Sequence, residues 1–233
     1  MKVRIKFSKH GPMKFIGHLD IMRYFQKAMR RADVAICYSG GFSPHQIMSF
    51  AAPLGVGITS NGEYLDIETE DTEDLSTMKD RLNQVMVEGV EIKSVRRLPD
   101  SAANAMSIVA AADYTMVFRQ GYEPEDTAGW MKGVEEFYRQ DHILITKKTK
   151  KGQKELDLKP LVYEIRAEGE RLFLTISTGS SENIKPELVL DAYYQHLGQE
   201  RPQFAFQVQR EEVYAKAPEG ASRPFLTLEE IGE

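Results

Sequence analysis

The same order of strand-like and helix-like segments occurs twice along this 233-residue chain, and that repeat constrains the fold most. In the first half the apolar spacing predicts helices at 18–32 and 72–87, and extended segments at 2–8, 34–38, 47–52, 63–69 and 90–97. In the second half it predicts helices at 124–139 and 185–197, and extended segments at 112–119, 142–148, 154–167, 171–177 and 204–213. Each half follows the order of a split βαβ unit. We therefore predict an α+β protein of tandem ferredoxin-like (split βαβ) domains with antiparallel sheets.

The composition between these segments sets the expected domain boundaries. We predict an N-terminal ferredoxin-like domain at 1–98 and a C-terminal one at 109–216. The segment 99–108 lacks apolar periodicity and is expected to be a linker. The last residues, 217–233, are rich in Pro, Gly and Glu and are expected to form a loose tail.

Charge is distributed unevenly along the chain. Residues 1–62 hold nine Lys and Arg and two Asp, a net charge of +7, whereas the whole chain carries -5. Such segregation predicts a positively charged surface that is held for an anionic partner. The nine cations are Lys2, Arg4, Lys6, Lys9, Lys14, Arg23, Lys27, Arg30 and Arg31.

Four of these cations fall on the predicted helix 18–32. Arg23, Lys27, Arg30 and Arg31 are separated by steps of four, three and one residues, so they form one cationic stripe. Cations that neutralise phosphates bind nucleic acid without reading its sequence. A solvated helix face has the same pattern, and the helix macrodipole favours Arg30 and Arg31 near a C-terminus.

The segment Tyr38-Ser-Gly-Gly-Phe-Ser-Pro-His45 is a second candidate for contact with RNA. Its two glycines permit positive φ and expose backbone N–H groups, which can bind an anion. The phenylalanine can stack on a base or fill the core, and a turn with structural glycines explains the segment equally well. We expect this loop and the stripe to share one cleft. The candidate RNA-binding residues of the loop are Gly40, Gly41, Phe42, Ser43 and His45.

A second basic segment lies in the other half of the chain. Residues 143–160 carry six Lys against Glu155 and Asp157, a net charge of +4. Lys154 is our candidate for a further contact with a nucleic-acid backbone. A sheet edge protected by charge is the alternative interpretation.

Two histidines are weak candidates for catalysis, because imidazole titrates near neutral pH. His18 and His45 can act as general acid and base in RNA cleavage, although their spacing does not demand it. His18 at the start of a helix serves equally well as a packing or capping group. No i, i+4 pair of metal ligands occurs around His10, His18, Asp20 and His45, so we predict no metal site. Phosphate-binding and dinucleotide-binding glycine motifs are absent, and we predict no cofactor.

The rest of the composition excludes several classes of protein. The single cysteine, Cys37, excludes an internal disulfide and an iron–sulfur cluster held by this chain alone, and it indicates a reducing, cytoplasmic location. No run approaches the ~18 apolar residues of a membrane span, and no signal peptide is apparent. We therefore expect no membrane partner.

The N-terminal half carries a long string of motifs that resembles one family. The string contains Phe15-Ile-Gly-His-Leu-Asp20, Ala28-Met-Arg-Arg31, Gly41-Phe-Ser-Pro-His45, Pro53-Leu-Gly55-Val-Gly57 and Glu63-Tyr-Leu-Asp66. It is similar to the bacterial radical SAM-linked proteins, a domain of unknown function found beside or fused to a radical SAM protein. Lys154, Asp157 and Lys159-Pro-Leu161 resemble a second, weaker motif of that family. Gly17 and Gln46 depart from the family pattern, where Ser and a second Pro are usual.

The resemblance implies a radical SAM partner protein that is encoded nearby or fused in relatives. The family's gene neighbourhoods, near ribonuclease E/G and ribosomal genes, imply RNA. We therefore expect a non-catalytic RNA-binding module, related to tRNA or rRNA, that is accessory to a radical SAM enzyme. The alternatives are a metal-independent RNA-processing enzyme that uses His45 and His18, and a protein–protein adaptor without RNA.

Overall fold

The computed structural model describes residues 1–149, 152–179 and 182–232, and of residues 147–149 and 152–154 it describes the backbone alone. The chain divides into two compact units: the first is Met1–Ala111 with Arg210–Glu233, and the second is Ala112–Gln209. Strands β5 (Val109–Phe118) and β10 (Phe206–Lys216) each contribute residues to both units. The second unit is therefore an insertion within the first along the sequence.

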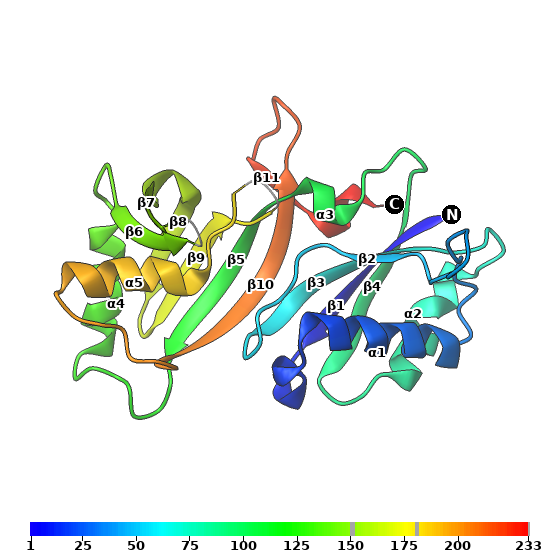
Figure 1. The fold of residues 1–233 in the computed structure, drawn as a ribbon, viewed down its shortest axis with the longest axis horizontal. Coiled ribbons are helices and arrows are strands. Elements are labelled where there is room, and N and C mark those ends of the chain that lie inside the picture. Colours follow the sequence, from blue (N-terminus) through cyan, green and yellow to red (C-terminus); the bar gives the residue numbers. More distant parts are fainter. Residues whose placement is uncertain (150–151, 180–181, 233) are drawn as a thin grey trace. The chain divides into compact units, whose positions relative to one another are not determined.

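The first unit is built on a sheet with the strand order β4-β1-β3-β10. Strand β1 pairs antiparallel with both β3 and β4, and the short β2 pairs antiparallel with β3 (Figure 1). Its first four strands therefore follow the order β4-β1-β3-β2, which is that of a split βαβ unit. The elements are β1 (Lys2–Lys9), η1 (Gly11–Phe15), α1 (His18–Arg31), β2 (Met48–Phe50), β3 (Thr59–Glu68), α2 (Leu75–Val85), β4 (Val90–Leu98), α3 (Ala105–Ile108), β11 (Phe225–Thr227) and η3 (Leu228–Ile231).

One face of this sheet is apolar and packs against α1 and α2. Alternate residues of β1 (Val3, Ile5 and Phe7) are buried there with Phe25 of α1 and Leu82 of α2. Alternation of side chains along a strand assigns the next residues, Arg4 and Lys6, to the opposite face. Helix α1 shows the matching pattern, because its buried residues are Ile21, Phe25, Ala28 and Met29.

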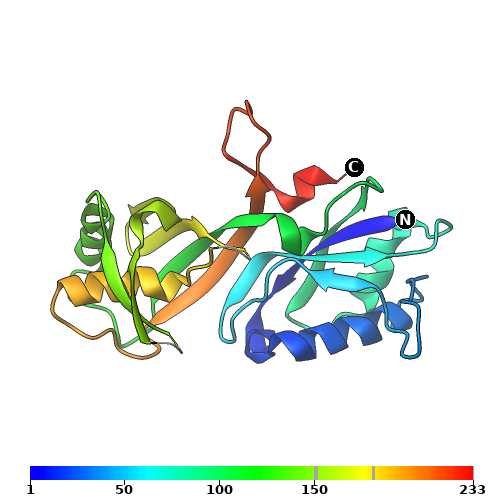
Figure 2. The ribbon, with the colours of Figure 1, turned by 45° about the horizontal axis from the view of Figure 1, so that its top comes forward.

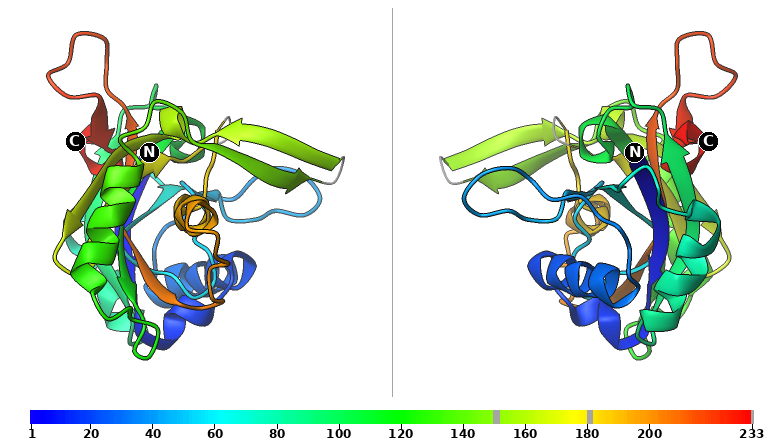
Figure 3. Two further views of the ribbon diagram at one scale, coloured as in Figure 1. Left: turned by 90° about the vertical axis from the view of Figure 1, so that its left-hand side faces the viewer. Right: turned by 90° about the vertical axis from the view of Figure 1, so that its right-hand side faces the viewer.

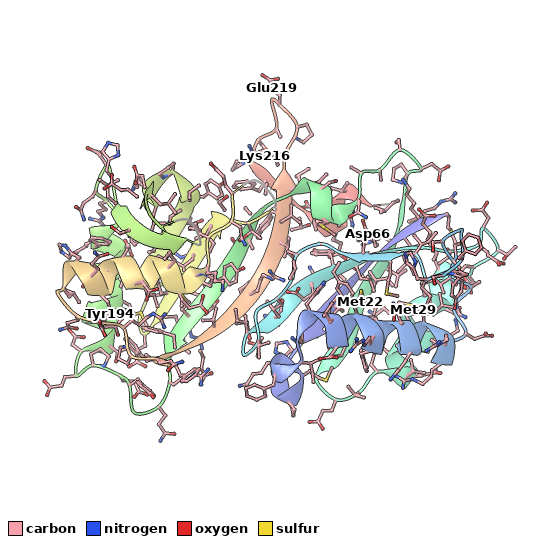
Figure 4. All side chains as sticks on the ribbon, in the orientation of Figure 1. Met22, Met29, Asp66, Tyr194, Lys216 and Glu219 are labelled. Carbon is pink, nitrogen blue, oxygen red and sulfur yellow. The ribbon has the colours of Figure 1, made fainter. Side chains whose placement is uncertain are left out.

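Leu19 lies outside the buried stripe of α1, although its three-residue spacing from Met22 predicts it on the apolar face. Its side chain is 61% exposed. The buried face is defined by Ile21, Phe25 and Met29, and a residue two positions before Ile21 lies on the opposite side of a helix with 3.6 residues per turn. Figure 4 labels two methionines of α1, of which Met22 is half-buried and Met29 is fully buried.

The opposite face of the sheet holds buried charges. The Arg4 guanidinium donates to both carboxylate oxygens of Asp66 at 2.7 and 2.9 Å, and its third contact is the Leu228 carbonyl oxygen at 3.0 Å. Lys6 is paired with Glu212 at 2.6 Å and Glu229 at 3.2 Å. Burial alone lowers the pKa of Lys6, but these two carboxylates outweigh it and hold that pKa above its ordinary value.

The C-terminal residues take part in this face, so the prediction of a loose tail at 217–233 does not match the described part of the chain. Strand β11 pairs antiparallel with β10, and η3 follows directly (Figure 2). Leu228 is fully buried, and Thr227 and Glu230 close a capping box at the start of η3. Composition could not reveal this, because the partners of these residues, Arg4 and Lys6, lie more than 200 residues earlier.

Strands β3 and β10 approach each other closely at Gly62. A Cβ atom on Gly62 would lie 2.8 Å from the Glu211 carbonyl oxygen and 3.1 Å from the Glu212 Cα. Next to this contact the buried Arg210 guanidinium of β10 pairs with the Glu63 carboxylate and donates to the Ala52 carbonyl oxygen at 2.9 Å. A residue with a side chain at position 62 would push these strands apart, so the sequence requires glycine here.

The second unit has the strand order β10-β5-β9-β8, with β8 and β9 antiparallel. Strands β6 and β7 form a separate antiparallel pair. Trp130 of α4 and Tyr193 of α5 are in edge-to-face contact, with ring centroids 5.1 Å apart. The remaining elements are α4 (Thr127–Phe137), β6 (Leu144–Thr149), β7 (Gly152–Asp157), η2 (Lys159–Leu161), β8 (Val162–Glu168), β9 (Arg171–Ser177) and α5 (Pro186–His196).

The predicted fold class is confirmed, since the structure is a mixture of helices with a large, mostly antiparallel sheet. The finer assignment to two ferredoxin-like domains stays a prediction, with which the strand order of each unit agrees. The boundaries differ from those predicted. The expected linker at 99–108 contains α3, whose Ala105 is fully buried, and it belongs to the first unit.

Several predicted elements begin or end elsewhere. Residues 34–38 form only isolated bridges, Ile36 to Thr69 and Tyr38 to Gln46. The expected strand 154–167 is interrupted by η2, because Pro160 cannot donate to a strand partner. Pro124 precedes α4 instead of forming its first turn, since the Asp126 carboxylate accepts from the Gly129 N–H and caps the helix there.

Candidate nucleic-acid interface and pocket

Helix α1 presents its predicted cations to solvent. Arg23, Lys27, Arg30 and Arg31 are all exposed. Arg23 is paired with Asp20 at 3.2 Å, and Arg31 reaches the Val85 carbonyl oxygen at 3.4 Å. Within the described residues, Lys27 and Arg30 have no ion-pair partner. These four residues are called the α1 row below, and Lys27 and Arg30 are the members without an ion-pair partner in the described part of the chain.

The other N-terminal cations do not extend this surface. Arg4 and Lys9 are buried, with exposed fractions of 1% and 2%. Lys9 donates to the Ile16 carbonyl oxygen at 2.8 Å, and burial lowers its pKa. Lys2 donates to the carbonyl oxygens of Asp100 and Ala102 at 2.8 and 3.1 Å. The prediction of one surface formed by all nine cations is therefore wrong, because four of them are tied into the fold.

The glycine loop is a small hairpin closed by backbone bonds. The Ser39 N–H donates to the His45 carbonyl oxygen at 2.8 Å, and the Ile47 N–H donates to the Cys37 carbonyl oxygen at 2.9 Å. Gly41 adopts φ +101°, a conformation that favours glycine. Gly40, Ser43 and Phe42 at the tip are exposed, and Phe42 is 110% exposed, so it does not fill the core. In both views of Figure 3 this hairpin extends from the same side of β1 as α1.

His45 is held at the base of this hairpin. The Ser39 hydroxyl oxygen accepts from the His45 N–H at 3.1 Å and lies 2.8 Å from the imidazole Nδ1. A hydroxyl that donates its proton to Nδ1 places the ring proton on Nε2. His45 can therefore present an Nε2–H donor to a ligand.

A pocket of about 430 Å³ opens beside His45 within the first unit. Its polar lining comes from Lys2, Ser39, His45, Ser49, Asp66, Glu68 and Asn104, and its apolar lining from Ile47, Met48, Ile67, Leu98, Ala102 and Ala103. Lys2 stands opposite both Glu68 of β3 and Leu98 of β4 in the sheet register, so these three side chains share the face that also carries Asp66. The pocket thus lies on the charged face of the sheet.

The structure does not bring the other predicted site residues into this pocket. The α1 row and the tip residues Gly40, Gly41, Phe42 and Ser43 are absent from its lining. His18 packs edge-to-face on Phe50, with ring centroids 5.5 Å apart, and does not line the pocket either. The expected cleft shared by the loop and the stripe stays a prediction, since the cationic row and this pocket are separate features of one unit.

Two further predictions concern other parts of the molecule. The side chain of Lys154 and those of Lys147 and Lys148 lie outside the described residues, as do Lys150 and Lys151 altogether. Across residues 1–149, 152–179 and 182–232, no group of three or more His, Cys, Asp or Glu is placed to hold a metal ion. In the same part of the chain, no helix is long and apolar enough to cross a membrane.

The sequence reasoning missed most of the pocket. Glu68, Asn104 and Met48 carry no motif, and they meet because β2 pairs with the end of β3 and the 102–104 segment folds over the same face. The one signal that could have located the pocket was the alternation along β3, which places Asp66 and Glu68 on one face.

Comparison with known proteins gives a family and no function. No curated protein matches this chain. Among solved structures, a Cbf5-Nop10-Gar1 complex is similar over 91% of this chain, with 12% identity and a TM-score of 0.42. This chain spans 48% of that structure's length. An unknown protein from Galdieria sulphuraria is similar over 90% of this chain and 96% of its own, with 12% identity and a TM-score of 0.28. At such TM-scores neither likeness bears on function. Residues 2–186 match a family model, and the chain belongs to that family, which is described as an uncharacterized protein conserved in bacteria (DUF2344).

Proposed function

We propose that this chain is a non-catalytic RNA-binding module that presents tRNA- or rRNA-related RNA to a partner radical SAM enzyme. The observation that carries the RNA part is the exposed α1 row, of which Lys27 and Arg30 have no ion-pair partner among the described residues. The chain as a whole carries a net charge of -5, and a polyanion is attracted to a local row of cations such as this one.

Two exposed aromatic side chains support single-stranded RNA over duplex. Tyr38 is 53% exposed and Phe42 is fully exposed on the hairpin that extends from the same side of β1 as α1. Aromatic side chains stack on unpaired bases, and each such contact stabilises binding by about 1–3 kcal/mol. The combination of a cationic row and stacking residues is typical of proteins that bind single strands.

The partner part of the proposal rests on the resemblance to radical SAM-linked proteins, and exposed apolar residues support it. Phe15, Leu19 and Val56 are 64%, 61% and 64% exposed. The Gly57 N–H donates to the Lys14 carbonyl oxygen at 2.8 Å, which holds the segment of Val56 beside η1. Exposed apolar residues on neighbouring segments, as on η1 and the segment of Val56, are typical of protein–protein contacts.

The RNA part is tested by charge reversal and salt. Fluorescence anisotropy of a labelled single-stranded RNA of mixed sequence should give an affinity that falls with salt, with a slope near -0.7 per phosphate contact, or about -2.8 for four contacts. Lys27→Glu with Arg30→Glu should at least halve that slope and abolish binding near physiological salt. The matched control is Lys79→Glu with Lys132→Glu, which makes the same change in net charge at exposed positions elsewhere. Equal affinities of the two double variants would refute the proposal.

The partner part is tested by co-purification with the neighbouring radical SAM protein. Leu19→Asp with Val56→Asp should lose the partner and keep the affinity for RNA. Nuclease treatment distinguishes the adaptor alternative, because an adaptor that needs no RNA retains its partner and shows no affinity for RNA in the first assay. His45→Ala distinguishes the enzyme alternative, since a non-catalytic module releases no cleaved RNA before or after this change.

A further inference from the structure

The pocket on the charged face of the first unit has a lining that suits a neutral ring. Its volume of about 430 Å³ falls within the range of sites that hold small organic molecules, about 300–1,000 Å³. Ile47, Met48 and Leu98 contribute apolar surface. Apolar walls of this kind hold an unstacked base by its two faces.

The charged groups at the pocket disfavour an anionic ligand. Asp66 is occupied, because its carboxylate accepts from Arg4 and from the Ala105 N–H at 2.8 Å. Lys2 is occupied by two carbonyl oxygens. Glu68 has no ion-pair or hydrogen-bond partner for its carboxylate within the described residues. The free Glu68 carboxylate repels a phosphate placed close to it and accepts hydrogen bonds from neutral donors.

Two hydrogen-bond donors at the pocket complement the Glu68 carboxylate, which is an acceptor. The Asn104 Oδ1 accepts from the Met106 N–H at 2.9 Å and from the Ser49 hydroxyl at 3.1 Å, so the Asn104 Nδ2 is left to donate. When the Ser39 hydroxyl donates to the His45 Nδ1, the imidazole carries its proton on Nε2, and His45 then supplies an Nε2–H donor. The pocket therefore offers one bidentate acceptor and two separate donors.

We propose that this pocket binds a guanine base. Guanine is the RNA base with two neighbouring donors, N1–H and the 2-amino group, that match the two oxygens of one carboxylate. Its O6 and N7 atoms accept from donors such as Asn104 and His45. Adenine presents an acceptor at N1, which a carboxylate repels. The proposal rests on the proposed function for the source of the base, which is an unpaired guanosine of the bound RNA.

The first arm of the test uses free nucleosides and isothermal titration calorimetry. Guanosine should bind and adenosine should bind at least about 5-fold more weakly, because a bidentate pair discriminates by about 1–3 kcal/mol, or about 5- to 160-fold. Glu68→Gln should weaken guanosine binding by the same factor, and Glu70→Gln, an exposed carboxyl outside the pocket, should leave it unchanged. Equal affinities for the two nucleosides, or a Glu68→Gln variant with unchanged affinity for guanosine, would overturn the proposal.

The second arm uses labelled oligouridine with one central guanosine or one central adenosine. Ala103→Trp fills the pocket from an exposed position and should remove the preference for guanosine, whereas Ser101→Trp, outside the lining, should keep it. This pair keeps the test decisive if Glu68→Gln fails to fold. If oligonucleotides bind through the α1 row with no preference for guanosine, the proposal that the pocket binds guanine is overturned and the proposed function stays intact. Binding of guanosine without any binding of RNA would support the pocket and overturn the proposed function.

Discussion

The buried ion pair between Arg4 and Asp66 gives a sharp prediction about stability. Their side chains are 1% and 11% exposed, and the Asp66 carboxylate has two partners, the guanidinium and the Ala105 N–H. Replacing Arg4→Met leaves that carboxylate buried with one neutral donor and leaves the Leu228 carbonyl oxygen without its donor. Breaking a buried pair from one side costs about 3–5 kcal/mol, and we expect this loss of unfolding free energy.

A second substitution separates the charge from the lost packing. Asp66→Asn keeps an acceptor for the Ala105 N–H and removes the uncompensated charge. The double variant Arg4→Met/Asp66→Asn should therefore be more stable than Arg4→Met alone, by about 2 kcal/mol, which is within the usual range of coupling between residues in contact. Asp66→Asn alone should be destabilised, because it leaves the buried guanidinium without a counter-charge.

Urea unfolding at neutral pH measures these differences in unfolding free energy, and two spectroscopic signals are used to follow it. The only tryptophan, Trp130, lies in the second unit, so its fluorescence follows that unit, whereas far-ultraviolet circular dichroism follows both. With a urea dependence of about 2 kcal/mol per molar, a loss of 3–5 kcal/mol lowers the midpoint of the first unit by about 1.5–2.5 M. Divergence of the two signals would show which unit has been destabilised.

Lys27→Met is the matched control, because it removes an exposed cation from the same N-terminal segment. It should change stability by less than about 0.5 kcal/mol. An Arg4→Met variant as stable as Lys27→Met would refute the assignment of Arg4 to a buried pair. If the double variant loses as much unfolding free energy as the two single variants together, the coupling between Arg4 and Asp66 is refuted.

Two further predictions concern the C-terminus and the β6–β7 pair. Leu228→Ala should cost about 2–5 kcal/mol in urea unfolding, because the side chain is fully buried, whereas Glu219→Ala at an exposed position should cost nothing measurable. The hydrogen bond from His142 at 2.8 Å, with the Ile143 and Lys159 N–H groups, lowers the pKa of Asp157 to about 2. The stabilisation of the folded state by the ionised Asp157 is complete above pH 3.8, the ordinary carboxyl pKa. It is lost as the pH falls toward 2. The same hydrogen bond raises the pKa of His142. The stabilisation of the folded state by protonated His142 is therefore complete below pH 6.5, and it is lost as the pH rises through the raised pKa. Nuclear magnetic resonance titration of Asp157→Asn should return the His142 pKa toward 6.5, and an unchanged value would contradict the pairing.

The local pattern of the sequence predicts the regular elements well and their partners poorly. Arg171–Ser177 was predicted at its observed bounds, and the predicted helices 18–32 and 185–197 match α1 and α5 to within a residue at each end. These segments are bounded by turn residues or, for α5, begin with Pro186, and such signals act over a few positions. The short β2 depends on its pairing with β3, and the η2 turn depends on Pro160, so the period of the apolar residues alone misplaced both.

Charge along the sequence was a poor guide to charge on the surface. Arg4 and Lys6 alternate with apolar residues, as exposed residues of a half-buried strand do. Their carboxylate partners lie 62 and more than 200 residues away, and no local rule pairs them. The α1 row was predicted correctly as exposed, because helical spacing separates it from Phe25 and Met29 without reference to any distant residue.

The separation of the α1 row from the pocket has a consequence for recognition. Binding by the row depends on released counterions and weakens steeply with salt, since each lost phosphate contact changes the slope by about 0.7. Binding in the pocket depends on hydrogen bonds to a neutral ring between apolar walls, which salt screens little. If both act on one RNA, raising the salt lowers the affinity of guanosine- and adenosine-containing strands together and leaves the ratio between them nearly constant. A ratio that collapses together with the affinity places the discrimination in the row, and the pocket then takes no part in reading the RNA.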